Sequence, residues 1–207
     1  MTKPESRESA SRPDWDGKAL TTADAGVQTL SVVTEMGSFE IVLDTAAPET
    51  CNYFAIAASN GVFDDGSIFR IVSREQTEDS NVSPIDVVQV GTQLGLGETR
   101  HAIPHEHTGV TGIHHEKWVV SAARYRPGEL YYSFFICMKD QPELDKGGSR
   151  QADGEGFAAF GRVSSGFDVV ASIFDCAESH DELVNPIRVN RIAAKSSKGV
   201  NTCTKHG

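Results

Sequence analysis

Residues 133–138, SFFICM, and residues 157–163, FAAFGRV, are two aromatic-rich apolar runs near the middle of the chain. The loop between them, residues 139–156, is rich in Gly, Asp and Gln. Short apolar runs that are bounded by turn-forming residues are typical of strands in a buried sheet. The two runs therefore predict a pair of strands, and the fold can be built outward from them.

Further strand-like runs lie on both sides of this pair. They occupy residues 30–35, 39–43, 68–72, 85–90, 118–123 and 187–193. The first two flank Met36-Gly37-Ser38 and so predict a hairpin, because a short turn containing glycine joins two β-rich segments. About eight short strands emerge from this pattern, and no internal repeat is visible.

Two segments have the features of helices. Pro48 and Glu49 suit a first helical turn, because proline loses no hydrogen bond there and glutamate complements the helix dipole. This helix would end at Asn60-Gly61, while residues 167–174 form a short amphipathic pattern. Many strands with two helices that are far apart in sequence predict a mainly β fold: a closed eight-stranded antiparallel β-barrel capped by two α-helices.

Composition is that of a globular protein with one domain. The chain has 207 residues, of which 39% are hydrophobic and 23% are charged. Residues 1–28 are polar and predict a flexible tail, residues 29–194 form the predicted domain, and residues 195–207 are a second polar tail. The first 26 residues have no apolar centre and so do not resemble a secretory signal, which favours a cytoplasmic location.

Charge and cysteine spacing exclude several classes of partner. The net charge of -10 argues against binding to nucleic acid or to anionic membranes, whose phosphates would repel this surface. The longest apolar runs fall well short of the roughly 20 residues that a membrane-spanning helix needs. The four cysteines form no CxxC pair, which indicates reduced thiols rather than a zinc site or a disulfide framework. We expect a monomer.

Several short motifs follow one another along the chain in a distinctive order. After the hairpin come residues 47–54 (APETCNYF), 65–72 (DGSIFRIV), 88–91 (VQVG), 120–124 (VSAAR), 133–136 (SFFI) and 160–163 (FGRV). Each motif is weak alone, but together and in this order they resemble the cyclophilin family of peptidyl-prolyl isomerases. The loop at residues 140–145, with its glycine-rich extension, is similar to a divergent bacterial-type branch of that family.

The resemblance implies an enzyme that rotates X-Pro peptide bonds and so assists protein folding, with proline-containing peptides or protein clients as its partners. Arg70 matches the catalytic arginine of the family, Gln89 the residue that binds the substrate backbone, and Phe135 the floor of the proline pocket. The full set of substrate-binding positions that the resemblance implies is Val87, Gln89, Ala123, Arg124, Phe135, Leu144 and Phe157.

The sequence departs from the family pattern at several of these positions. Phe69 precedes the arginine where a histidine is common, and Ser133 replaces a glutamine before the paired phenylalanines. Arg124 replaces an asparagine whose main-chain carbonyl binds substrate, and Phe157 replaces a pocket histidine. The tryptophan that contacts cyclosporin in the family has no counterpart, and Glu143 lies nearest to its position. We therefore expect weak cyclosporin binding.

The implied chemistry fits these residue types. Rotation about an amide bond has a barrier of about 18–20 kcal/mol, and lowering it requires stabilisation of the twisted amide rather than a nucleophile, metal or cofactor. A guanidinium can donate a hydrogen bond to the prolyl nitrogen, which gains a lone pair in that state. We accordingly expect no cofactor and no metal. The simpler alternative is that Arg70 is a strand arginine paired with a carboxylate.

Two other functions stay open at this stage. The first is a metal site in the histidine-rich segment 91–117, whose candidate ligands are His101, His105, Glu106, His107, His114, His115 and Glu116. Their spacing is not that of HExxH, and Pro104 interrupts any helix, so a polar loop is the simpler interpretation. The second is a barrel that binds proline-containing peptides with little or no catalysis.

Overall fold

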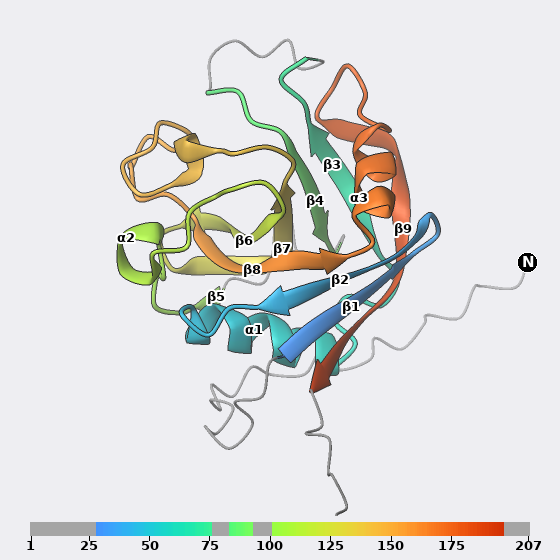
Figure 1. Ribbon diagram of the computed structural model, residues 1–207, viewed down its shortest axis with the longest axis horizontal. Helices are drawn as coiled ribbons and strands as arrows, with labels where there is room; N and C mark the ends of the chain where they lie inside the picture. Colours follow the sequence, from blue (N-terminus) through green and yellow to red (C-terminus); the bar gives the residue numbers. More distant parts are fainter. Residues whose placement is uncertain (1–27, 76–82, 93–100, 197–207) are drawn as a thin grey trace, which may run out of the picture.

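The computed structural model describes residues 28–75, 83–92 and 101–196 (Figure 1). Residues 1–27 and 197–207, which make up nearly all of the two predicted tails, lie outside the described residues. The first strand begins at Gln28 and the last one continues through Lys195 and Ser196, so regular structure reaches slightly beyond the predicted domain at both ends.

The described strands close into an antiparallel barrel. They are β1 (Gln28–Thr34), β2 (Gly37–Leu43), β3 (Gly66–Val72), β4 (Val87–Gly91), β5 (His101–Ala102), β6 (Val119–Arg126), β7 (Glu129–Cys137), β8 (Ala158–Ser165) and β9 (Glu182–Ser196). Eight of them follow the order β4-β3-β9-β1-β2-β8-β6-β7, and pairing of β4 with β7 closes the ring. The two-residue β5 is added to β7. The predicted eight-stranded barrel is thus confirmed.

Both predicted helices are present, and the described residues contain one further short α-helix and a 3₁₀ helix, η3 (Pro142–Leu144). Helix α1 (Pro48–Ser59) packs against β8, β9 and β1, and α3 (Phe167–Phe174) packs against β2 and β4. Helix α2 (Thr108–Thr111) lies in the segment that we expected to be a loop. Its four residues are too few to show a periodic pattern, and it forms because His107 caps its start and Gly112 ends it with a left-handed φ of 73°.

No described helix combines the length and apolar character that crossing a bilayer would require. In the same described part of the chain, Cys51, Cys137 and Cys176 are free thiols, while Cys203 lies outside it. Burial raises the pKa of the Cys51 thiol to about 12, so this side chain serves as a small core residue.

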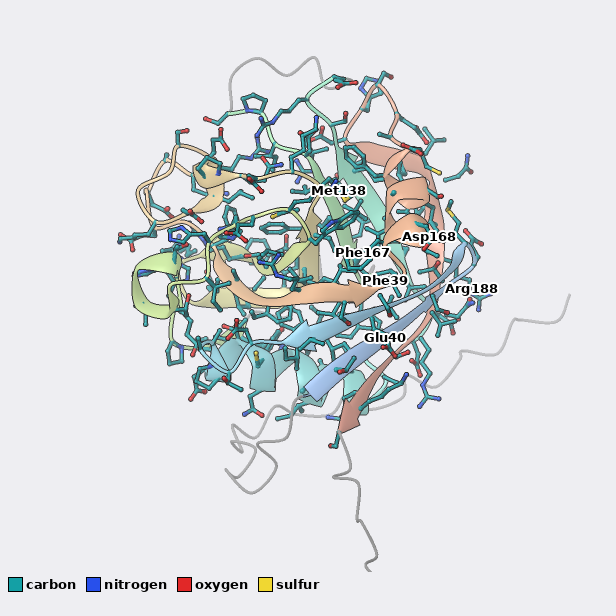
Figure 2. The ribbon with its side chains drawn as sticks, viewed as in Figure 1. Phe39, Glu40, Met138, Phe167, Asp168 and Arg188 are labelled. Carbon is teal, nitrogen blue, oxygen red and sulfur yellow. The ribbon has the colours of Figure 1, made fainter. Side chains whose placement is uncertain are left out.

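Aromatic side chains fill the interior of the barrel. Phe54 of α1 stacks on Phe160 of β8 with 4.4 Å between ring centroids, and Phe134 of β7 meets Phe54 edge-on at 5.7 Å. At the start of α3, Gly166 approaches β2 so closely that a Cβ there would lie 2.7 Å from the Cα of Phe39. Phe39 and Phe167 mark this junction in Figure 2. Strands and helices therefore supply most of the interior, and Phe63 from the turn before β3 completes it.

The histidine-rich segment is attached to α1 through Glu106. This side chain is 7% exposed. Its carboxylate accepts hydrogen bonds from the main-chain N–H groups of Glu49 and Thr50 at 3.1 and 2.8 Å, and from the Thr50 hydroxyl at 2.7 Å. The N-cap residue Ala47 has no side chain that could do this. A carboxylate from a distant segment thus caps the positive end of the helix.

Candidate active site

A pocket of about 320 Å³ lies on the outer face of the barrel, where β3, β4, β6 and β7 meet the loop that precedes β8. All eight positions predicted from the sequence line it: Arg70, Val87, Gln89, Ala123, Arg124, Phe135, Leu144 and Phe157. The structure therefore brings every predicted site residue together. Four further lining residues were not anticipated, namely Ile85, Tyr131, Arg150 and Gln151.

The apolar part of the pocket follows from the alternation of side chains along a strand. Phe134 belongs to the cluster inside the barrel, whereas its neighbour Phe135 belongs to a second cluster on the outer face. Phe157 meets Phe135 edge-on with 5.3 Å between ring centroids, and Leu144 in the same cluster is 1% exposed. The result is an apolar cup with Phe135 as its floor.

Arg70 reaches the pocket because β3 contains a bulge. The pairing of β3 with β4 shifts between Ile68 and Arg70, so that Phe69 has no partner and Arg70 lies opposite Gln89. An extra residue of this kind redirects the side chains that follow it. This places a guanidinium beside the apolar cup.

A chain of hydrogen bonds fixes the orientation of the Gln89 amide. The Arg70 guanidinium donates to Gln89 Oε1 at 3.3 Å, and Gln89 Nε2 donates to Tyr131 Oη at 3.3 Å and to Ser133 Oγ at 3.1 Å. The Ser133 hydroxyl then donates to the main-chain oxygen of Val90 at 2.8 Å. Burial raises the pKa of Tyr131 above its usual value, which keeps its hydroxyl protonated.

Arg70 also forms an ion pair. Its Nη2 atom lies 2.5 Å from Oδ2 of Asp181, and the two side chains are 29% and 24% exposed. Arg70 thus has the carboxylate partner that the simpler sequence interpretation required. It also lines the pocket, so the ion pair and a role in the site occur together. No sequence motif pointed to Asp181, because it lies in an irregular segment just before β9.

Arg124 contributes more than the strand edge that we expected. Its side chain is 1% exposed and turns toward the loop before β8, where Nε donates to the main-chain oxygen of Gly156 at 2.7 Å and both terminal nitrogens donate to Asp153 at 2.8 Å. The guanidinium carbon lies 5.0 Å from the centre of the Phe157 ring. The hydrogen bonds lower the pKa of Asp153 to about 2. Arg124 therefore holds the loop that carries the Phe157 wall.

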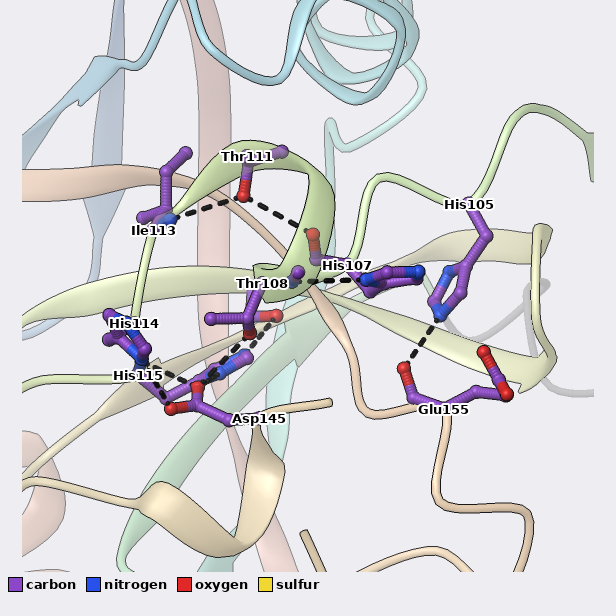
Figure 3. Close-up of polar contacts among 11 residues, drawn as sticks. His105, His107, Thr108, Thr111, Ile113, His114, His115, Asp145 and Glu155 are labelled. Atoms are coloured by element: carbon purple, nitrogen blue, oxygen red, sulfur yellow. Dashed lines mark hydrogen bonds and ion pairs between the residues drawn. The ribbon is translucent and has the colours of Figure 1, made fainter. Parts of the chain in front are cut away.

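The clustered histidines are occupied by other contacts (Figure 3). His115 Nδ1 lies 2.6 Å from Oδ1 of Asp145 and its Nε2 lies 2.9 Å from Ser121 Oγ, while His114 Nδ1 lies 2.7 Å from Oδ2 of Asp145. Burial raises the pKa of Asp145, but the hydrogen bonds from both histidines outweigh it and leave this pKa well below its usual value.

His105 has a separate partner, since its Nε2 lies 3.1 Å from the main-chain oxygen of Glu155. Among residues 28–75, 83–92 and 101–196, no three His, Cys, Asp or Glu side chains are grouped so that they could hold a metal ion. The geometry therefore gives no support to the alternative of a metal site in this segment.

Solved structures with the same architecture include a cyclophilin type peptidyl-prolyl cis-trans isomerase of Cryptosporidium parvum. It superimposes with a TM-score of 0.65 at 17% sequence identity and covers 83% of this chain and 99% of its own. The structure of that protein in the presence of the dipeptide Ala-Pro gives a TM-score of 0.64. At this level of identity, the likeness establishes the fold.

Sequence relatives give the family. A peptidyl-prolyl cis-trans isomerase of Streptomyces antibioticus is 30% identical over 150 residues, which cover 71% of this chain and 83% of the relative. A peptidyl-prolyl cis-trans isomerase-like protein of Aspergillus fumigatus is 30% identical over 166 residues, which cover 76% and 89%. The family model matches residues 29–194. The chain therefore belongs to the family of cyclophilin type peptidyl-prolyl cis-trans isomerases.

Proposed function

We propose that this protein catalyses the cis-trans rotation of X-Pro peptide bonds, with Arg70 as the catalytic residue. The observation that carries the proposal is the position of the Arg70 guanidinium at the same pocket as an apolar cup built by Phe135, Leu144 and Phe157. Membership of the isomerase family and the Ala-Pro dipeptide used with the Cryptosporidium parvum relative support a proline ring as the occupant of the cup.

The reaction needs stabilisation of one twisted state. The apolar cup anchors the prolyl ring, while the carbonyl of the preceding residue rotates out of conjugation with the prolyl nitrogen. That nitrogen then becomes pyramidal and gains basicity, so a hydrogen bond from Arg70 is stronger in the twisted state than in either planar state. A rate enhancement of 10⁵ requires about 7 kcal/mol of such preference. Permanent charge suits arginine to this task at any physiological pH.

The remaining residues would bind and orient the peptide. Gln89, whose amide is fixed by Tyr131 and Ser133, faces the same space as Arg70 and would meet the substrate backbone. Ala123 would supply a strand edge beside it, and Val87 would complete the apolar lining. These roles predict that truncation of Gln89 weakens peptide binding, whereas truncation of Arg70 mainly lowers the rate.

The wider setting of this activity is also a proposal. We infer that the protein acts on folding or folded clients in the cytoplasm as a monomer, binds neither nucleic acid nor membranes, and responds weakly to cyclosporin. The net charge of -10 supports the absence of binding to nucleic acid and to membranes. Glu143, which pairs with Arg74 at 3.6 Å, places a carboxylate in the loop where cyclosporin would meet an indole in the family.

A protease-coupled isomerisation assay on an X-Pro peptide tests the catalytic proposal. Wild type should accelerate the exchange strongly, and Arg70→Ala should lose most of this activity. Arg162→Ala is the matched control, because Arg162 is an exposed arginine on β8 that pairs with Glu116 away from the pocket. Background rates for all three proteins would contradict the proposal.

Peptide binding separates the enzyme from the alternative binding module. In an NMR titration with the same X-Pro peptide, a module would bind the peptide with no acceleration of exchange. An enzyme of the kind proposed would both bind and catalyse, and Arg70→Ala would keep much of the affinity because the apolar cup is unchanged.

A further inference from the structure

The Arg70 guanidinium donates hydrogen bonds to two side chains, one from each terminal nitrogen. Nη1 donates to Gln89 Oε1 at 3.3 Å and Nη2 donates to Asp181 Oδ2 at 2.5 Å. The first contact is long for a hydrogen bond and has an uncharged acceptor, whereas the second is short and joins two opposite charges. Asp181 is therefore the stronger of the two restraints on the catalytic side chain, and the guanidinium retains further N–H groups for a substrate.

Asp181 is held firmly enough to act as a restraint. Its main-chain oxygen accepts a hydrogen bond from Ile71 N–H at 2.8 Å, which ties it to the residue that follows Arg70 on β3. The next residue, Glu182, begins β9 and pairs directly with Arg70 in the sheet. The carboxylate thus projects from the residue just before β9, beside the strand that carries the guanidinium.

Stability is a poor explanation for this ion pair. Both side chains are about one quarter exposed, at 29% and 24%, and partly exposed ion pairs contribute little to folding because water competes and side-chain entropy is lost. Orientation is a better explanation. Arginine has a long flexible side chain, and catalysis by a preorganised donor requires that this side chain be fixed before the substrate arrives.

We propose that Asp181 is a positioning residue that holds the Arg70 guanidinium in its catalytic orientation. The proposal rests on the function proposed above, and it reconciles the two interpretations of Arg70: the carboxylate pair is present because the catalytic arginine needs it. Asp181 does not touch the substrate in this scheme, and its effect passes entirely through Arg70.

The test uses Asp181→Asn, which keeps the shape of the side chain and removes its charge. Asp168→Asn, at an exposed position in the first turn of α3, is the matched control. We expect Asp181→Asn to lower the on-enzyme isomerisation rate in exchange NMR by about tenfold, while the peptide affinity changes less than about twofold. Asp168→Asn should change neither quantity. An equal loss of affinity and rate would overturn the proposal.

A double mutant separates positioning from a general structural role. If Asp181 acts through Arg70, Asp181→Asn should have no effect on the residual rate in the Arg70→Ala background. A further loss in that background would show that Asp181 acts on the pocket by another route and would overturn the proposal.

A readout independent of activity distinguishes this proposal from the proposed function. The ¹⁵N relaxation of the Arg70 Nε–Hε group should report a rigid side chain in wild type and a markedly more mobile one in Asp181→Asn. Equal rigidity in both proteins would overturn the positioning role. An inactive wild type would defeat the proposed function, while this NMR comparison would still decide whether Asp181 holds Arg70.

Discussion

The inner and outer faces of β7 are covered by different parts of the chain. On the inner face, Phe134 is fully buried among aromatic rings that come from α1, from β8 and, with Phe63, from the short turn between α1 and β3. On the outer face, Phe135 is covered by Leu144 and Phe157, which come from the segment between β7 and β8. Regular elements supply most of the inner cluster, whereas the outer cluster depends more strongly on the position of loops.

Polar side-chain contacts, here called anchors, hold these loops in position. Arg124 binds Asp153 and Gly156 next to Phe157, Asp145 accepts hydrogen bonds from two histidines, and Glu106 attaches the histidine-rich segment to α1. The comparison teaches that folding and binding can be perturbed separately in this protein. Changes on the inner face should act mainly on stability, and changes on the outer face should act mainly on the pocket. Loss of an anchor should lower stability by a smaller amount than loss of an inner-face ring.

The largest expected effect comes from the two adjacent phenylalanines. Phe134→Ala leaves a cavity in a closed core and should lower the free energy of unfolding by about 3–5 kcal/mol. Phe135→Ala should cost less, because one side of its ring already faces the pocket, but it should weaken binding of an X-Pro peptide more than about tenfold. Urea unfolding and peptide titration on both variants check this. If the two variants lost similar stability and bound the peptide with equal affinity, the distinction between the two faces would be wrong.

An intermediate effect is expected at Glu106. Glu106→Ala removes the acceptor for the N–H and hydroxyl of Thr50, both of which are buried, and should lower the free energy of unfolding by about 2 kcal/mol. Glu106→Gln keeps an acceptor oxygen and is the matched control, with a smaller loss. Thermal and urea unfolding provide the measurement. An unchanged midpoint for Glu106→Ala would show that α1 does not depend on this distant cap.

The smallest effect concerns pH and the Arg124–Asp153 anchor. Because the folded protein lowers the pKa of Asp153 to about 2, below the usual value near 3.9, the contribution of this pair is fully present above about pH 4. It should disappear as the pH falls toward 2, and it should be modest because the Asp153 side chain is 36% exposed. Unfolding midpoints measured from pH 6 to pH 2 check this prediction.

Asp153→Asn provides the comparison for that series. Its midpoint should lie below that of wild type at pH 6, and the two curves should converge as the wild-type carboxylate becomes protonated. Parallel curves over the whole range would show that Asp153 contributes nothing through its charge.

Much of the barrel could be predicted from local pattern. The eight ring strands and two longer helices are visible in the sequence because apolar runs and turn residues mark them. The eight predicted pocket positions came from the resemblance to cyclophilins, and the structure gathers all of them. The segment 101–117 could not be predicted in the same way, since α2 is too short to show a periodic pattern and the Glu106 cap is a tertiary contact.

The remaining site residues show why sequence reasoning ends where it does. Tyr131 precedes Ser133 on β7 and so shares its face, but only the folded barrel shows that both hydroxyls fix Gln89. Asp181 lies 111 positions from Arg70 in a segment without a motif. The direction of the Arg124 side chain depends on where Asp153 and Gly156 lie. Such long-range polar contacts leave no local signal in one sequence.

The pairing of β4 with β7 has a consequence for how the protein becomes active. These strands are distant in sheet order and meet only when the ring closes, and this seam places Gln89 of β4 opposite Phe135 of β7. The two sides of the pocket therefore meet only when the ring closes. During refolding, isomerase activity should return with the slow long-range pairing of β4 with β7 rather than with early strand formation. The recovery of activity would therefore measure the rate of ring closure.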